Sequence, residues 1–202
     1  MEIREKHLTL DGVRLADALS SLAKSELALG SYSSAIENAK KGLAALGADP
    51  SEHLSVVSGL YDVLGLCYMQ TNQFDKAVEV FNASIELCIK EYGETHFSLA
   101  AKYEILAEVY VLMTKFDEAA GMYEESLKIR KLQNPVRQDD IAKSYTGIGS
   151  MHLRKGDYFK ALEYYKDAED ILVKEFGPDH SSLLIVYLEL GHFYEKMSEF
   201  DL

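Results

Sequence analysis

Few residues of this chain have the types and spacing that an active site needs. The six histidines include no pair four residues apart on a helix with a third metal ligand nearby. Gly147-Ile-Gly149-Ser150 matches part of a nucleophile elbow, but no strand precedes it, and that motif needs a strand-to-helix turn. Phosphate-binding and dinucleotide-binding glycine motifs do not occur. We therefore predict that the chain is not an enzyme and uses no cofactor or metal.

The carboxylates and thiols have simpler explanations than catalysis. Glu86 lies four residues before Lys90, the spacing of an ion pair on a solvated helix face. Cys67 and Cys88 are too few for a disulfide framework, and both lie within apolar helical patterns. We expect them to be buried free thiols.

Composition limits the classes of partner. The chain has 33 acidic and 21 basic residues and a formal net charge of −12. Such a surface repels phosphate backbones and anionic membranes, so a nucleic acid is not expected as a partner. No apolar run approaches the roughly 18 residues of a spanning helix, which predicts no membrane insertion. The charged start, Met1-Glu-Ile-Arg-Glu-Lys-His7, is unlike a signal peptide, so we expect a cytoplasmic protein.

The elements that would position any site are predicted to be helices. Only three prolines occur, and Ala, Leu, Glu, Lys and Tyr fill long uninterrupted stretches. Alanines recur every 42 residues, each preceded by an aromatic residue three positions earlier. A second series of tyrosines, each followed four residues later by a small residue, repeats with the same period. The members of the four series are Ala35, Ala77, Ala119 and Ala161; Tyr32, Phe74, Phe116, Tyr158 and Phe200; Tyr61, Tyr103, Tyr145 and Tyr187; and Gly65, Ala107, Gly149 and Gly191.

Short breaks in the apolar pattern separate the series of tyrosines and small residues from the series of aromatic residues and alanines. These breaks, at Gln70-Thr-Asn-Gln, Met113-Thr-Lys and Lys155-Gly-Asp, are typical of helix-turn-helix corners. Each repeat is therefore expected to be a pair of antiparallel helices. The small residues would let the second helix approach the first, and the aromatic residues would fill the space between neighbouring units.

This pattern resembles the tetratricopeptide repeat, in which a large residue is followed by Leu-Gly and Tyr, and later by Ala-x3-Phe. The clearest copy reads Tyr61-x2-Leu64-Gly65-x2-Tyr68, then Ala77-x3-Phe81. The usual period is 34 residues, and the longer period here resembles the repeats of kinesin light chains. Two junctions carry that likeness, Lys90-Glu-Tyr-Gly93-Glu-Thr-His96 and Lys174-Glu-Phe-Gly177-Pro-Asp-His180, whereas the third copy has Gln133-Asn-Pro135 instead.

The junction residues also have structural roles to fill. Gly93 and Gly177 suit the C-caps of the preceding helices. Thr95 and Asp179 suit the N-caps of the following ones.

The resemblance implies an all-α fold, a right-handed superhelical solenoid of antiparallel helix pairs. We expect residues 1–10 to be an N-terminal lead-in and residues 11–202 to form the array. Because the last predicted helix exposes much apolar surface, we expect the natural protein to continue beyond residue 202 or to self-associate. Repeats are expected near 11–52, 53–95, 96–137 and 138–180, with the leading helix of a fifth at 181–202. Helices are expected near 12–29, 32–46, 54–71, 74–92, 97–113, 116–132, 139–155, 158–175 and 181–198.

The resemblance further implies that a peptide lies in a concave groove lined by the leading helix of each pair. Acidic and aliphatic residues at the centre of this groove favour an apolar segment with basic flanks. The same acidic residues argue against the Lys/Asn/Arg clamp that grips acidic chaperone tails. An ordinary solvated helix surface is the alternative for any single position. The expected groove residues are Lys24, Asp62, Leu66, Met69, Glu104, Glu108, Val111, Thr146, Ser150, Arg154, Glu189 and His192.

The function favoured by these patterns is that of an adaptor or scaffold that binds a protein or peptide. One alternative is a structural array that forms homo-oligomers through its C-terminal helix, which includes Leu190 and Tyr194. Another is a regulatory region attached to an enzyme or signalling domain outside these residues.

Overall fold

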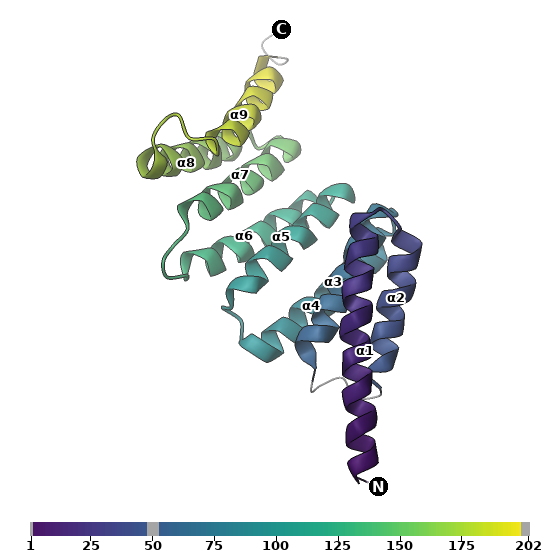
Figure 1. The fold of residues 1–202 in the computed structure, drawn as a ribbon. Helices are drawn as coiled ribbons and strands as arrows, with labels where there is room; N and C mark the ends of the chain where they lie inside the picture. Colours follow the sequence, from purple (N-terminus) through teal and green to yellow (C-terminus); the bar gives the residue numbers. More distant parts are fainter. Residues whose placement is uncertain (1, 48–52, 199–202) are drawn as a thin grey trace. The chain divides into compact units, whose positions relative to one another are not determined.

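The computed structural model describes residues 2–47 and 53–198, with side chains for residues 11–47 and 53–198. Every regular element in these ranges is an α-helix, which confirms the all-α fold class (Figure 1). Phe200 and the predicted repeat ends at 52 and 202 lie outside the described residues. The helices are α1 (Glu2–Ala28), α2 (Tyr32–Ala45), α3 (Leu54–Gln70), α4 (Phe74–Tyr92), α5 (Phe97–Leu112), α6 (Phe116–Lys131), α7 (Gln138–Lys155), α8 (Tyr158–Phe176) and α9 (Leu183–Ser198).

The start of α1 is the largest departure from the predicted boundaries. The sequence pattern placed it near residue 12, whereas the helix begins at Glu2. The prediction followed apolar periodicity, which is weak in this stretch. Residues 2–10 nevertheless contain good helix formers such as Glu, Arg, Lys and Leu and no glycine or proline, so the helix can propagate through them.

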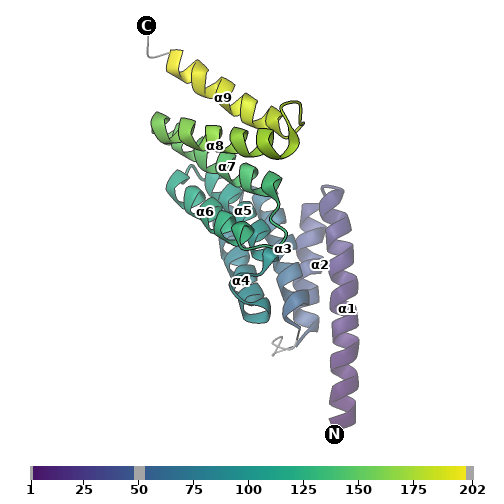
Figure 2. The same ribbon diagram turned by 90° about the vertical axis from the view of Figure 1, so that its left-hand side faces the viewer.

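The chain divides into two compact units, residues 1–94 and residues 95–202. In the first unit, α1 packs against α2 and α3, and α3 packs against α4. In the second unit, α5 packs against α6, α6 against α7, and α7 against α8. Helix α9 packs against α8 and, less extensively, against α7 (Figure 2).

The corner inside each helix pair has the same backbone geometry in every copy. The first or second residue after the leading helix has a positive φ, at Gly30, Asn72, Thr114 and Gly156, which are 42 residues apart. The following N–H donates to a carbonyl five residues earlier, as from Lys115 to Tyr110 at 2.9 Å. This arrangement is the Schellman motif that ends many helices. The predicted helix-turn-helix corners are therefore confirmed.

Two junctions between repeats end in glycines that no other residue could replace without strain. Gly93 has φ 89° and ψ 167°, and Gly177 has φ 88° and ψ 167°. This backbone region is accessible almost only to glycine. Their N–H groups donate to the carbonyls of Ile89 and Val173, which closes the preceding helices. The predicted C-cap glycines are confirmed.

The predicted N-caps at Thr95 and Asp179 are wrong. His96, and not Thr95, is the N-cap of α5, and its Nδ1 contacts the hydroxyl of Ser98. Before α9, the N–H of Ser182 donates to Nδ1 of His180 at 3.3 Å. Only in the second junction does a histidine ring accept from a backbone N–H, as an N-cap side chain would; the His96 ring contacts a side-chain hydroxyl, and no side chain caps α5 by a hydrogen bond.

The small residues of the leading helices are contacted by aromatic rings, as expected from the repeat. A Cβ on Gly65 would lie 2.5 Å from the ring of Phe81, and one on Gly149 would lie 2.8 Å from the ring of Tyr165. Phe81 and Tyr165 are almost fully buried. Glycine is needed at these two positions because the ring of the second helix occupies the space of a side chain.

Candidate binding groove on the leading helices

The predicted groove residues lie on the leading helices but differ in how accessible they are. Lys24 on α1 is exposed, as are Glu108, Arg154 and His192 in the second unit. Glu104 and Thr146 are buried. The partly buried members are Asp62, Leu66, Met69, Val111, Ser150 and Glu189.

The structure places Glu104 inside the second unit, where its position is 6% exposed, so it does not lie on an open groove surface. Its carboxylate lies 2.7 Å from the guanidinium of Arg130 on α6 and accepts a hydrogen bond from Ser126 at 3.1 Å. The ammonium of Lys143 on α7 is 3.4 Å away. Because a buried carboxylate needs such partners, its first role is to join the helices.

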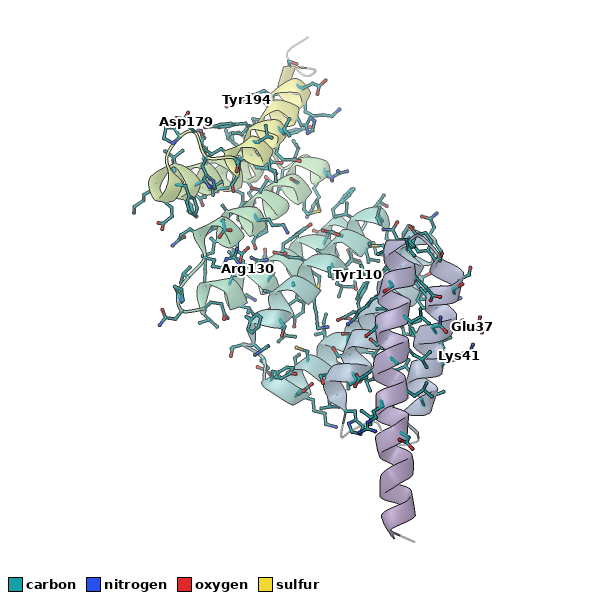
Figure 3. The ribbon with its side chains drawn as sticks, in the orientation of Figure 1. Glu37, Lys41, Tyr110, Arg130, Asp179 and Tyr194 are labelled. Carbon is teal, nitrogen blue, oxygen red and sulfur yellow. The ribbon has the colours of Figure 1, made fainter. Side chains whose placement is uncertain are left out.

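The same guanidinium carries this network into the next repeat. Arg130, labelled in Figure 3, also lies 2.6 Å from Asp140 on α7. Asp140 is in turn 3.4 Å from the guanidinium of Arg137. The charged network thus connects α5, α6 and α7, and it is formed entirely by residues of this chain.

Thr146 is the second predicted groove residue that is buried, and it lines a smaller cleft together with Leu172 of α8 and Ile185 of α9. Its hydroxyl donates to the carbonyl of Ala142 one turn earlier at 2.9 Å. The residue is 5% exposed because α8 covers this side of α7. Asp62 on α3 has a similar internal role, since it accepts a hydrogen bond from Ser84 of α4 at 2.6 Å.

Four other predicted residues come together in one cleft between α7 and α9. Ser150 and Arg154 line it from α7, and Glu189 and His192 line it from α9. The cleft has a volume of about 560 Å³ and is also lined by Leu153. This is the part of the second unit in which the predicted groove residues of two neighbouring leading helices face a common space.

Hydrogen bonds hold the α9 wall of the cleft in place. The Glu189 carboxylate lies 2.9 Å from the Ser150 hydroxyl and 3.3 Å from the Tyr165 hydroxyl of α8. Burial, together with the nearby Glu189 carboxylate, raises the pKa of Tyr165 well above its ordinary value. Tyr165 therefore stays protonated at neutral pH and can donate to Glu189.

The other wall of the cleft is cationic. The Arg154 guanidinium lies 5.8 Å from the ring centre of Phe116, a cation–π contact, while the residue stays exposed. Its neighbour Lys155 forms an ion pair with Asp117 of α6. A segment in this cleft would meet the cation of Arg154 from α7, and from α9 the carboxylates of Glu189 and Glu195 together with the ammonium of Lys196.

Six cleft residues are not among the expected groove residues given above, and three of these six lie together in the chain. Lys155, Gly156 and Tyr158 come from the corner between α7 and α8. The prediction counted only positions on the leading helix, whereas the corner lies at the end of the same cleft. The series of aromatic residues at the starts of the second helices, which includes Tyr158, was the signal that could have identified it.

Within the residues whose side chains are described, no group of three or more His, Cys, Asp or Glu residues could hold a metal ion. Over the same part of the chain, no helix is long and apolar enough to cross a membrane.

Repeated helix pairs whose leading helices line a cleft define a class, the helical-hairpin repeat proteins. The chain belongs to the tetratricopeptide repeat family, which it matches over residues 56–131 and 140–202. Its likenesses identify it more closely as a tetratricopeptide repeat protein of the kinesin light chain type.

Two curated relatives illustrate the range of proteins that carry similar repeats. RxLR effector protein SFI4 of Phytophthora infestans is 23% identical over 154 residues, which are 76% of this chain and 45% of that protein. Protein KINESIN LIGHT CHAIN-RELATED 2 of Arabidopsis thaliana is 24% identical over 180 residues, 86% of this chain and 27% of that protein. The chain thus spans less than half the length of these relatives.

Solved structures share the fold over nearly the whole chain. BtubC (BKLC) from P. vanneervenii superposes with a TM-score of 0.76 at 20% identity, over 99% of this chain and 80% of that one. A variant of a putative kinesin light chain from Podospora anserina gives a TM-score of 0.77 at 21% identity, over 93% and 88% of the two chains. At these identities the likeness concerns the fold alone.

Proposed function

We propose that this protein is a non-catalytic interaction scaffold that binds a segment of a partner protein in the cleft between α7 and α9. The tetratricopeptide repeat family and its fold support a role in protein–protein interaction in general. The observation that carries the finer proposal is the convergence of Ser150, Arg154, Glu189 and His192 on one cleft.

The cleft offers an extended segment both anchoring and orientation. Leu153 and Tyr158 supply apolar surface, while Arg154 and Glu195 supply charges of opposite sign. Complementary charges of this kind set the register of a bound segment more than they add affinity. Two other predictions stay untested, namely a cytoplasmic location and the remaining groove residues.

The predicted preference for basic flanks now depends on fewer carboxylates. It rested on Asp62, Glu104 and Glu108, but Glu104 already faces Arg130 and Lys143. Asp62 already accepts a hydrogen bond from Ser84. Of the three, Glu108 is the residue that is exposed. A basic flank would therefore be recognised next to Glu108 on α5.

The proposal is tested by selecting binders from a displayed library of random peptides on the immobilised protein. Peptides selected on the wild type are then titrated into an Arg154→Glu variant and into a Lys166→Glu control. Both positions are exposed, and both changes reverse one positive charge, but Lys166 lies on α8 and is not a cleft residue. We expect Arg154→Glu to weaken binding by roughly ten-fold, which is about 1.4 kcal/mol, and the control to change little.

Circular dichroism of both variants establishes that they remain folded. Selected peptides that bind wild type and Arg154→Glu equally well would place the binding surface elsewhere and contradict the cleft assignment.

A further inference from the structure

Two clefts of the second unit lie on either side of α7, near the first turns of the leading helices. The Phe97 cleft has a volume of about 340 Å³ and is lined by Phe97 of α5 and by Pro135 of the connection between α6 and α7. The Ile185 cleft has a volume of about 160 Å³ and is lined by Ile185 of α9 and by Leu172 of α8. Asp140 of α7 lines both clefts, so they are neighbours.

The two clefts are copies of one site, one repeat apart. Each is formed where a leading helix, the second helix of its pair and the next leading helix meet. Residues that line the first cleft are in register with residues that line the second, 42 residues later, namely Phe97 with Asp139, Ala100 with Ala142, and Arg130 with Leu172. A surface that recurs with the repeat fits a ligand that also repeats, with one group for each cleft.

The side of each leading helix that lines these clefts is not the side on which the second helix of its pair packs. Lys143 of α7 is in register with Ile185, and its side chain is 63% exposed although α8 packs against α7. Ala101 of α5 is also in register, and it is exposed although α6 packs against α5. The clefts are therefore a feature of the repeat itself.

The charged residues that line these clefts are already paired within the chain. Arg130 lies 2.6 Å from Asp140, which the guanidinium of Arg137 also approaches at 3.4 Å. The ammonium of Lys143 lies 3.4 Å from the carboxylate of Glu104. Because these charges are matched internally, the clefts select a ligand by its shape and its apolar side chains and not by its charge.

The apolar side chains of the clefts are accessible, and the spacing of the clefts limits the conformation of a ligand. Phe97 is 64% exposed and Ile185 is 58% exposed. Packed helices lie about 8–10 Å apart, so two clefts that are one leading helix apart are separated by about that distance. A polyproline II segment has three residues per turn and rises roughly 3.1 Å per residue, so side chains on one face are about 9 Å apart. A β-strand places them about 7 Å apart, which fits less well.

We infer that the two clefts together bind a proline-rich segment of a partner protein in the polyproline II conformation, with apolar side chains three residues apart, one in each cleft. The exposed ring of Phe97 suits this ligand, because aromatic side chains commonly line surfaces that bind such segments. The polyproline II backbone has no internal hydrogen bonds, so its carbonyls can accept from the side-chain amide of Asn134 in the Phe97 cleft. This surface shares no residue with the cleft that contains Arg154, so the inference does not depend on the function proposed there.

The test uses a fluorescently labelled peptide of repeated Pro-Pro-Leu triplets, titrated into the intact protein and followed by fluorescence anisotropy. Three residues per turn bring all of its leucines to one face of the polyproline II helix. The comparison peptide has the same number of leucines at every second position, so that successive leucines point to different faces. We expect the triplet peptide to bind at least roughly ten-fold more tightly than the comparison peptide. One triplet peptide should bind per protein, because it spans both clefts.

Each cleft is tested by a variant with a matched control. Phe97→Ala removes the exposed ring of the first cleft, and its control Phe159→Ala removes an exposed ring at the start of α8, outside both clefts. Ile185→Lys places a charge in the second cleft, and its control Leu184→Lys makes the same change at the neighbouring exposed position of α9. We expect each cleft variant to weaken binding of the triplet peptide by roughly ten-fold and each control to change it little.

Several results would overturn the inference. Equal binding of the triplet and comparison peptides to the wild type, or no binding of either, would show that the clefts do not select the polyproline II spacing. Cleft variants that bind as tightly as their controls, with all variants folded by circular dichroism, would place the peptide elsewhere. Two peptides bound per protein would mean that the clefts act separately. Weaker binding to Arg154→Glu would mean that the peptide occupies the cleft of the proposed function instead.

Discussion

The helix pairs α5–α6 and α7–α8 lie in the same unit and have the same backbone arrangement. The interface between the two helices of a pair, however, differs in chemistry from one pair to the other. In α5–α6, Glu104 faces Arg130 and Ser126 across the helix pair. At the same register in α7–α8, the residues are Thr146, Leu172 and Ala168. Leu172 is 1% exposed, so one pair has an apolar interior where the other has an ion pair.

The difference teaches which features the fold requires. The corner geometry recurs in each described hairpin, and an aromatic ring meets the glycine of the leading helix in both α3–α4 and α7–α8, whereas the polarity of the inner positions differs between hairpins. A buried ion pair adds little net stability over an apolar pair of similar size, but either charge alone is strongly unfavourable. Glu104 and Arg130 must therefore be replaced together. The α5–α6 pair also gains a link to Asp140 of the next helix, which an apolar residue could not make.

The largest expected effect comes from replacing only one residue of the buried ion pair in α5–α6 by its counterpart in α7–α8. Arg130→Leu removes the guanidinium and leaves Glu104 buried beside Asp140 without its main partner. We expect the free energy of unfolding to fall by about 3–5 kcal/mol, measured by urea denaturation.

The double variant Glu104→Thr, Arg130→Leu reproduces two of the three inner residues of α7–α8, Thr146 and Leu172. It should recover most of that loss, because no unpaired charge remains inside. A double variant as unstable as Arg130→Leu would mean that the interior of α5–α6 requires charge.

A second change tests the glycine contact that distinguishes α7 from α5. Gly149→Ala would put a Cβ 2.8 Å from the ring of Tyr165, a fully buried side chain without room to move. We expect a loss of about 1–3 kcal/mol in thermal or chemical denaturation. The same substitution at Gly191, where nothing lies within 4 Å, should instead stabilise the protein slightly. Equal effects at both positions would contradict the crowding argument.

The tyrosines that face the leading helices provide a pH-dependent comparison. Burial, with smaller contributions from Glu108 and Glu104, raises the pKa of Tyr123 to about 12 from an ordinary 10. The folded state therefore holds this proton more tightly than the unfolded state. Its contribution to stability is complete below about pH 10 and is lost as the pH rises toward about 12.

Absorbance titration should accordingly show late-ionising tyrosines, Tyr165 among them, and one fewer in Tyr123→Phe. Between about pH 10 and pH 12, the free energy of unfolding of this variant should fall by about 2 kcal/mol less than that of the wild type. Titration of all tyrosines near pH 10 would contradict the burial argument.

The smallest expected effect concerns the corners. Thr114 of the α5–α6 corner has φ 58°, an unfavourable conformation for a β-branched residue, whereas the α7–α8 corner has Gly156. Thr114→Gly should stabilise the protein by about 1 kcal/mol. Differential scanning calorimetry would detect the higher melting temperature, and Gly156→Thr is the matched reverse change. A lower melting temperature for Thr114→Gly would show that the threonine hydroxyl, which donates to the Met113 carbonyl, outweighs the strain.

The sequence was sufficient to predict most of the fold because the repeat gives the same information several times. From α2 onward each helix boundary lies within two residues of its predicted position, since the aromatic series marks the first residue of each second helix. The start of α1 lacked such a marker. The junction caps were misassigned because Thr95 and Asp179 have suitable side chains, whereas α5 begins one residue later, after His96, and the Ser182 N–H donates to the His180 ring.

The groove was only partly predictable. Position along the leading helix correctly brought Ser150, Arg154, Glu189 and His192 to one cleft. The same counting placed Glu104 there too, because it cannot tell an exposed carboxylate from one that is internally paired. The register did contain a signal, since Arg130 occupies a position held by Cys88 and Leu172 in the other repeats. A cation at an otherwise apolar position indicates a buried partner, and Glu104 is that partner.

The recurring corner has a consequence for how such a chain can change in length. Each corner closes with the same main-chain hydrogen bonds, and its only special demand is a residue that tolerates positive φ. A duplication or deletion of 42 residues that begins and ends at two corners would leave every remaining turn intact. A duplication or deletion would keep Glu104 and Arg130 together only if it included the whole α5–α6 pair. Arg130 would also need Asp140 of the following helix as its second partner. The lineage of this array is therefore expected to preserve α5, α6 and α7 as one inherited segment, while the other pairs are free to be gained or lost.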